Sequence, residues 1–96
     1  MGHTPKLGLR RRYGGFALIT GAARGIGRAF AEYLAADGFD LLLIDREAEA
    51  TKALARTLRT EHRIEAHALI CDLAAPGLVE NAERWAARYD VGLLVN

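Results

Sequence analysis

The sequence predicts an α/β fold built on a parallel, doubly wound sheet. Two patterns support this prediction. Four short apolar stretches are typical of strands buried on both faces. They alternate with three longer stretches in which apolar residues recur every three or four positions, as in helices. A third observation is a glycine-rich turn between the first strand and the first helix. Strict alternation favours right-handed crossovers between parallel strands, and the expected spatial order of the strands is 3-2-1-4.

The expected elements follow one another without an internal repeat or a linker. Strands are expected near residues 15–20, 39–44, 65–71 and 91–95, and helices near 25–36, 47–61 and 78–89. In the first helix the apolar residues at helical spacing are Ile26, Ala29, Phe30, Tyr33 and Leu34. The inner faces of the other two helices are marked by Leu54, Ala55 and Leu58, and by Leu78, Ala82, Trp85, Ala86 and Tyr89. Gly38 suits the left-handed residue that ends a helix.

Length and composition indicate one small globular domain. Of the 96 residues, 51% are hydrophobic and 26% charged, as in soluble chains, and no apolar run approaches the ~20 residues that span a bilayer. The single cysteine, Cys71, cannot form an internal disulfide, and its strand setting predicts a buried, inert thiol. We therefore expect a cytoplasmic protein. His3, His62 and His67 lack metal-ligand spacing, so no metal site is predicted.

Charge is distributed unevenly along the chain. Residues 1–12 carry +4, from Lys6, Arg10, Arg11 and Arg12, whereas the remainder has nine basic and twelve acidic residues, or −3. A basic arm of this kind could contact nucleic acid or an anionic membrane. Without a recognition helix, the pattern instead favours a solvated, flexible arm at residues 1–12. We therefore expect neither nucleic acid nor a membrane as a partner.

The turn Thr20-Gly21-Ala22-Ala23-Arg24-Gly25-Ile26-Gly27 has the chemistry of a phosphate site. Gly21 permits a sharp exit from the strand, Gly25 lets the backbone approach a ligand, and Gly27 lets the helix lie close to the sheet. The following helix presents unpaired N–H groups and the positive end of its dipole, which contributes ~0.3–1 kcal/mol. The alternative is a glycine-rich turn that binds no ligand.

This turn, T-G-x-x-x-G-I-G after an apolar strand, resembles that of the short-chain dehydrogenase/reductase family. The resemblance implies that residues 13–96 form part of a Rossmann-type domain that binds NAD or NADP. Gly21, Arg24, Gly25, Ile26 and Gly27 would then surround the cofactor phosphates. In relatives that use NADP, a basic residue is often found at the place corresponding to Arg24.

Asp45 and Arg46 follow the second strand, about twenty residues beyond the glycine turn. In this fold an acid there accepts hydrogen bonds from the ribose hydroxyls and repels a 2′-phosphate. Arg46 favours NADP instead, because a guanidinium can bind that phosphate. If Asp45 points into the pocket, NAD is favoured, which is the reading we adopt. If it turns outward, Arg24 and Arg46 could together hold the 2′-phosphate of NADP.

Two further segments resemble cofactor contacts of the family. Asp72-Leu73, after the third strand, is similar to the family's Asp-Leu or Asp-Val pair, which meets the adenine ring. Alternatively, Asp72 caps the turn that follows it. Leu93-Leu94-Val95-Asn96 resembles the start of an Asn-Asn-Ala-Gly segment beside the adenine ribose, and Asn96 is its first residue.

The resemblance covers the first part of the family's domain and implies a truncated chain. No catalytic residue is assigned, because the family's serine and Tyr-x-x-x-Lys element have no counterpart: no lysine follows Tyr13, Tyr33 or Tyr89 four residues on. The parent would transfer hydride between the nicotinamide and a carbonyl or hydroxyl substrate, and residues 12–17 and 91–95 resemble ketoreductases acting on acyl or steroid-like ketones. A homo-oligomer is expected for the full-length form. The alternative is a non-catalytic half-domain that binds nucleotide or another protein; an epimerase or methyltransferase is less favoured.

Overall fold

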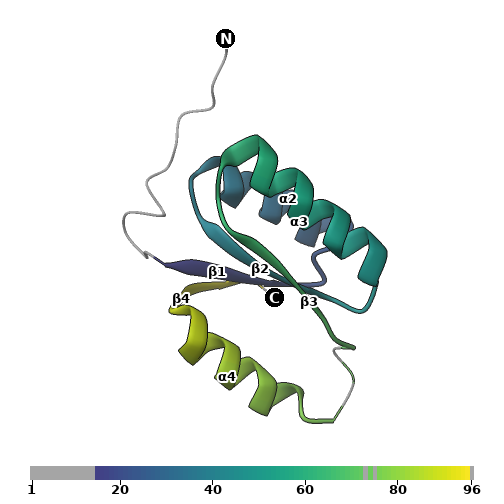
Figure 1. The fold of residues 1–96 in the computed structure, drawn as a ribbon. Coiled ribbons are helices and arrows are strands. Elements are labelled where there is room, and N and C mark those ends of the chain that lie inside the picture. Colours follow the sequence, from purple (N-terminus) through teal and green to yellow (C-terminus); the bar gives the residue numbers. More distant parts are fainter. Residues whose placement is uncertain (1–14, 73, 75, 96) are drawn as a thin grey trace.

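The computed structural model describes residues 15–72, 74 and 76–95, so the expected arm at residues 1–12 lies outside them. These residues form one parallel sheet between two layers of helices (Figure 1). In chain order the elements are β1 (Phe16–Thr20), α2 (Gly25–Ala36), β2 (Asp40–Asp45), α3 (Ala48–His62), β3 (Ala66–Ile70), α4 (Leu78–Tyr89) and β4 (Val91–Val95). The strand order is β3-β2-β1-β4, which confirms the predicted topology.

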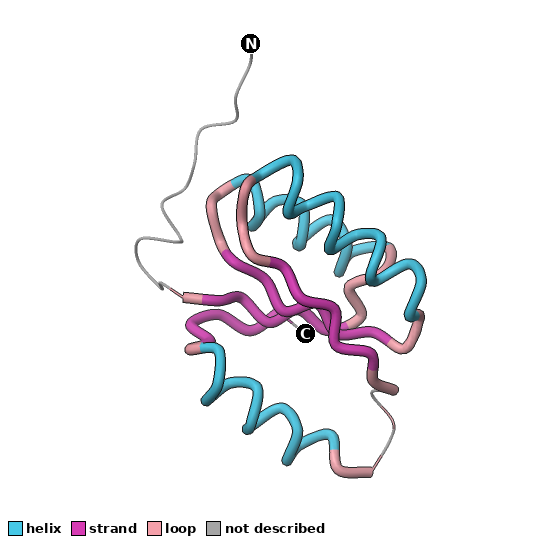
Figure 2. The backbone as a smooth tube through the Cα atoms, viewed as in Figure 1, coloured by secondary structure: helices cyan, strands magenta, loops and turns pink. Residues whose placement is uncertain are grey.

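The two central strands, β1 and β2, contribute residues to the hydrophobic cores on both faces of the sheet. β1 pairs with β2 in parallel, from Phe16 opposite Asp40 to Thr20 opposite Ile44. Helices α2 and α3 cover one face of the sheet and α4 covers the other (Figure 2). Because both faces are covered, the middle residues of the two strands are all buried, as the continuous apolar runs predicted.

Helix α2 ends as the sequence predicts. Gly38 has φ +94°, and its N–H donates to the Ala35 carbonyl at 3.0 Å. The next N–H, that of Phe39, donates to Leu34 at 3.0 Å, which closes the helix. Phe39 is fully buried in this connection, and β2 begins one residue later, at Asp40, than expected.

Only part of the apolar stripe of α2 faces the core. Ile26, Phe30 and Tyr33 are 78%, 44% and 41% exposed, whereas Leu34 is buried together with Ala31 and Ala35. The periodicity therefore predicts the helix and one of its buried residues, but not that alanines form the rest of its buried side.

The α4 face has a smaller core. Trp85 and Tyr89 are half-buried and pack on a cluster of Leu18, Leu42 and Ile44, as expected for the inner side of this helix. The side chains of Leu78, Ala82 and Ala86 lie outside the described residues. Cys71 is half-buried rather than buried, which corrects the expectation, because it follows the last residue of the outer strand β3. No helix in the described part of the chain is long and apolar enough to cross a bilayer.

Candidate functional site

Three of the segments predicted from the sequence lie together at the end of the sheet where the parallel strands have their carboxyl ends. Asp45, the last residue of β2, and Arg46, which follows it, line a cavity of about 280 Å³ together with Asp72 and Ala74, after β3. The glycine turn joins them because the Ala22 N–H donates to the Ile44 carbonyl at 3.3 Å. The fold thus brings the expected phosphate turn and two expected carboxylates to one place.

The glycines of the turn are required for different reasons. Gly21 and Gly25 have φ of +63° and +62°, and a Cβ built at either meets no heavy atom within 4 Å. Glycine is required at these two positions because of the positive φ, and the space beside each is open to a ligand. A Cβ at Gly27 would lie 2.1 Å from the Gly21 carbonyl oxygen. Gly27 therefore lets the helix lie against the turn itself, rather than against the sheet as expected.

The N-terminus of α2 is arranged to receive an anion. Arg24 stands at the N-cap position with no side-chain capping bond, and the first helical turn, which the structure describes throughout, has no acidic residue. The matching turn of α3, by contrast, contains Glu49. An external anion could therefore meet the N–H groups of α2 without competing with a carboxylate from that turn. This arrangement fits a cofactor diphosphate.

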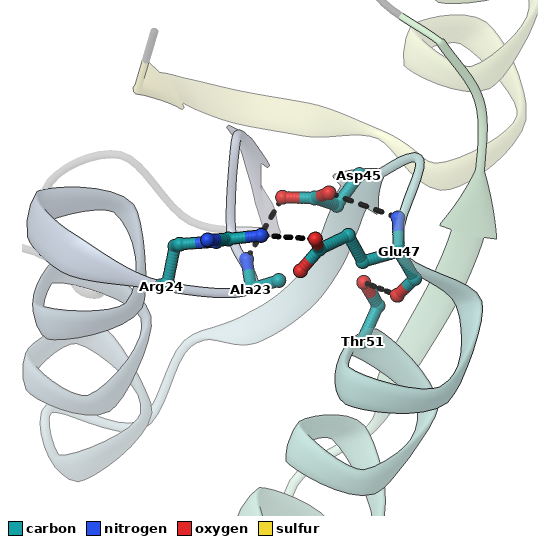
Figure 3. Close-up of polar contacts among 5 residues, drawn as sticks. All are labelled: Ala23, Arg24, Asp45, Glu47 and Thr51. Atoms are coloured by element: carbon teal, nitrogen blue, oxygen red, sulfur yellow. Dashed lines mark hydrogen bonds and ion pairs between the residues drawn. The ribbon is translucent and has the colours of Figure 1, made fainter.

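Asp45 connects the loop after β2 to the glycine turn (Figure 3). Its Oδ2 accepts the Ala23 N–H at 3.1 Å, and its Oδ1 accepts the Glu47 N–H at 3.0 Å. Partial burial raises the pKa of the Asp45 carboxyl, but the hydrogen bonds from Glu47 and Ala23 outweigh it. The Arg46 N–H and the Arg24 guanidinium add to this effect, so the pKa is held below its ordinary value. Each oxygen of this ionised group keeps acceptor capacity for a ligand.

An ion pair that the sequence analysis missed lies beside Asp45. The Arg24 guanidinium contacts the Glu47 carboxylate across the gap between the two loops (Figure 3). The side chains are 75% and 38% exposed, so the pair contributes only ~0–1 kcal/mol to stability. Thr51 steadies this loop, because its Oγ1 donates to the Glu47 carbonyl at 2.6 Å. Glu47 directly precedes a helix, which is the only signal that marked it in the sequence.

The other predicted site residues have three different outcomes. Asp72 lines the cavity, and its Oδ1 also accepts the Ala74 N–H at 2.9 Å, so the capping role weighed from the sequence is present. Leu73 and Asn96 lie outside the described residues. Ile26 is exposed on the outer side of α2. Within the described ranges, no three His, Cys, Asp or Glu side chains are grouped so that they could hold a metal ion.

Comparisons with known proteins agree on one family. Residues 15–96 match the family model described as short chain dehydrogenase. Inactive hydroxysteroid dehydrogenase-like protein 1 of Rattus norvegicus is 38% identical over 97 residues, which cover 96% of this chain and 29% of that protein.

Solved structures agree with this match. A 7beta-hydroxysteroid dehydrogenase, 32% identical, superposes with a TM-score of 0.83 over 90% of this chain and 33% of its own. The short-chain dehydrogenase from Sphingobium yanoikuyae in complex with NADPH is 38% identical, with a TM-score of 0.74 over 82% of this chain and 31% of its own. The chain therefore spans about a third of the length of these relatives.

Proposed function

The chain belongs to the short-chain dehydrogenase family, and we propose that it is the cofactor-binding N-terminal part of an oxidoreductase that acts on a carbonyl or hydroxyl group. One observation carries the proposal: the ionised Asp45 carboxylate is bonded to the glycine turn and borders the cavity shared with Asp72. When bound, a nicotinamide dinucleotide would supply the hydride donor or acceptor. The chain's own residues would bind and orient it.

In this proposal each segment binds a different part of the cofactor. The turn from Gly21 to Gly27 and the N-terminus of α2 hold the diphosphate through backbone N–H groups. Asp45 accepts the hydroxyls of the adenosine ribose. Asp72 and Leu73 meet the adenine ring, and Asn96 lies beside the ribose. Support for the first two assignments comes from the open space at Gly25 and from the acceptor capacity left on Asp45.

We favour NAD over NADP because of the charges around Asp45. A 2′-phosphate ~4 Å from this carboxylate would cost about 4 kcal/mol at an effective dielectric of ~20. Arg24 could compensate, but its guanidinium already pairs with Glu47. Arg46 is exposed, and an exposed contact contributes only ~0–1 kcal/mol. The complex of the Sphingobium yanoikuyae relative with NADPH keeps NADP as the alternative.

The relatives suggest a substrate class and also a second candidate function. Similarity to a 7beta-hydroxysteroid dehydrogenase favours a steroid-like ketone or alcohol as substrate. The rat relative is named inactive, which favours a protein that binds the nucleotide without turnover. We also propose a cytosolic location, with which the free thiol of Cys71 is compatible.

The test is to titrate the intact protein with NAD and then assay it by nicotinamide absorbance with a panel of steroid and acyl ketones. We expect micromolar-range binding that Gly25→Val weakens at least tenfold, about 1.4 kcal/mol. Glu32→Ala, on the same helix but beyond its first turn, serves as the matched control. Binding with turnover supports the oxidoreductase, and binding without turnover supports the second candidate. If folded Gly25→Val binds NAD as well as the wild type, the turn has no role in binding.

A further inference from the structure

The outer edge of the sheet carries a groove unrelated to the cofactor site. β3 is the last strand on this side, with α3 on one face of the sheet and α4 on the other (Figures 1 and 2). A cavity of about 510 Å³ follows its edge along residues 66–69. Its walls include Lys52, Arg56 and Arg59 from α3 and Tyr89 from α4. The groove thus lies where a further strand would continue the sheet between the two helical layers.

The backbone of β3 presents hydrogen-bonding groups to this groove. Its pairing with β2 is bounded by the bond from Leu41 N–H to the Glu65 carbonyl at 2.9 Å and by the bond from Cys71 N–H to the Asp45 carbonyl at 3.0 Å. In a parallel ladder alternate residues bond to the neighbouring strand, so Ala66, Ala68 and Ile70 direct their N–H and C=O groups outward.

One of these outward groups already has a partner. The Ala66 carbonyl accepts Nη1 of Arg59 at 2.6 Å. Ala68 and Ile70 have no partner for their outward groups within the described part of the chain. The unpaired length of the edge therefore begins beyond Ala66, follows the cavity at Ala68 and continues past the cavity to Ile70.

The charge of the groove selects what can bind there. Lys52, Arg56 and Arg59 recur at helical spacing, so they project from one side of α3. None of the described residues that line the groove is acidic. Arg88 adds a further cation beside the opposite wall, 5.4 Å from the centre of the Tyr89 ring. An acidic segment is therefore complementary to the groove.

A second copy of the chain fits poorly. Two β3 edges paired about a two-fold axis would bring both α3 helices to the same face of the joined sheet, with their basic side chains opposed. We propose instead that the β3 edge binds an extended, acidic peptide segment of a partner protein by adding it to the sheet as a strand. Ala68 and Ile70 supply the backbone bonds, and the basic side chains of α3 select the sequence.

The two walls imply a side-chain pattern for this segment. Successive residues of a strand point to opposite faces, so every second side chain meets the cations on α3. The intervening side chains meet the rings of His67 and Tyr89, whose centroids are 5.3 Å apart. The groove therefore selects acidic residues that alternate with apolar or aromatic ones.

The experiment uses the intact protein and a blocked eight-residue peptide of alternating glutamate and valine. Binding is measured by calorimetry, and amide hydrogen exchange is followed at Ala68 and Ile70. We expect the peptide to slow exchange at both N–H groups, and we expect the double variant Lys52→Glu, Arg56→Glu to weaken binding about tenfold. Arg28→Glu, an exposed arginine on α2, is the matched control and should leave binding unchanged.

Two further peptides separate the contributions. Replacing glutamate by lysine should abolish binding, and N-methylation of alternate residues should abolish it if the peptide adds as a strand. Equal binding of the lysine peptide, or unchanged exchange at Ala68 and Ile70, would overturn the proposal. Full binding of both N-methylated registers would show that charge alone holds the peptide, and strand addition would be refuted.

Discussion

Gly27 and Gly25 lie two residues apart in one turn, yet a methyl group should act differently at each. A Cβ at Gly27 would lie 2.1 Å from the Gly21 carbonyl oxygen and 2.8 Å from its carbon. Overpacking costs ~1–3 kcal/mol, and backbone atoms cannot rotate away, so we use about 3 kcal/mol. Greater helix propensity offsets ~1 kcal/mol of this cost. Gly27→Ala is therefore expected to lower the free energy of unfolding by about 2 kcal/mol.

At Gly25 a Cβ meets no heavy atom within 4 Å, but φ is +62°. The left-handed conformation costs an alanine ~1–2 kcal/mol, and the reduced entropy of the unfolded chain offsets ~0.4–1 kcal/mol. Gly25→Ala should therefore lower the free energy of unfolding by about 1 kcal/mol, within a range of ~0–1.6 kcal/mol. Its side chain enters the open space of the turn, so its main effect should be on NAD affinity.

The assay is urea unfolding of both variants of the intact protein, followed by circular dichroism, alongside NAD titration. The expected result is a crossed pattern, in which Gly27→Ala loses more stability and Gly25→Ala loses more affinity than its stability explains. If Gly25→Ala is the less stable variant, or if Gly27→Ala is as stable as the wild type, the packing of the turn against α2 is not as described.

Three other outcomes follow from the structure. Because hydrogen bonds hold the pKa of Asp45 below its ordinary value, its carboxylate stabilises the fold above its unfolded-state pKa of ~3.9, and this contribution is lost as pH falls through the folded-state pKa. Asp45→Asn should remove that pH dependence from urea unfolding measured between about pH 6 and 3. Glu47→Gln should release Arg24 and raise NADP affinity by up to about fivefold, with NAD affinity unchanged in the same titration. Residues 1–96 expressed alone should self-associate through the exposed face of α2, and Ile26→Glu with Phe30→Glu should shift them toward monomer in size-exclusion chromatography.

The order of the elements could be predicted because each depends on a local pattern. The continuous apolar run before Asp45 is typical of a strand covered on both faces, and Gly38 ends a helix through its own backbone freedom. The glycine turn and Asp45 could be located for the same reason, since their spacing along the chain fixes their place at the carboxyl ends of two adjacent strands.

What the sequence could not predict depends on contacts between distant segments. The Arg24–Glu47 pair joins two loops 23 residues apart, and nothing local at Glu47 points to the glycine turn. The buried side of α2 includes Ala31 and Ala35 beside Leu34, so the large apolar residues alone do not identify it. The groove beside β3 is formed by Lys52 and Arg56 of α3 together with Tyr89 of α4, which are far apart in the sequence.

Asp45 is proposed to bind the cofactor ribose and thereby to select NAD. The test of this role is the ratio of the dissociation constants for NADP and NAD, measured at two salt concentrations for the wild type and Asp45→Ser. Glu49→Ser, which removes a carboxylate from the first turn of α3, is the control for net charge. We expect Asp45→Ser to shift the ratio toward NADP by at least tenfold, about 1.4 kcal/mol, and Glu49→Ser to leave it unchanged. An unchanged ratio in folded Asp45→Ser would show that Asp45 does not bind the ribose.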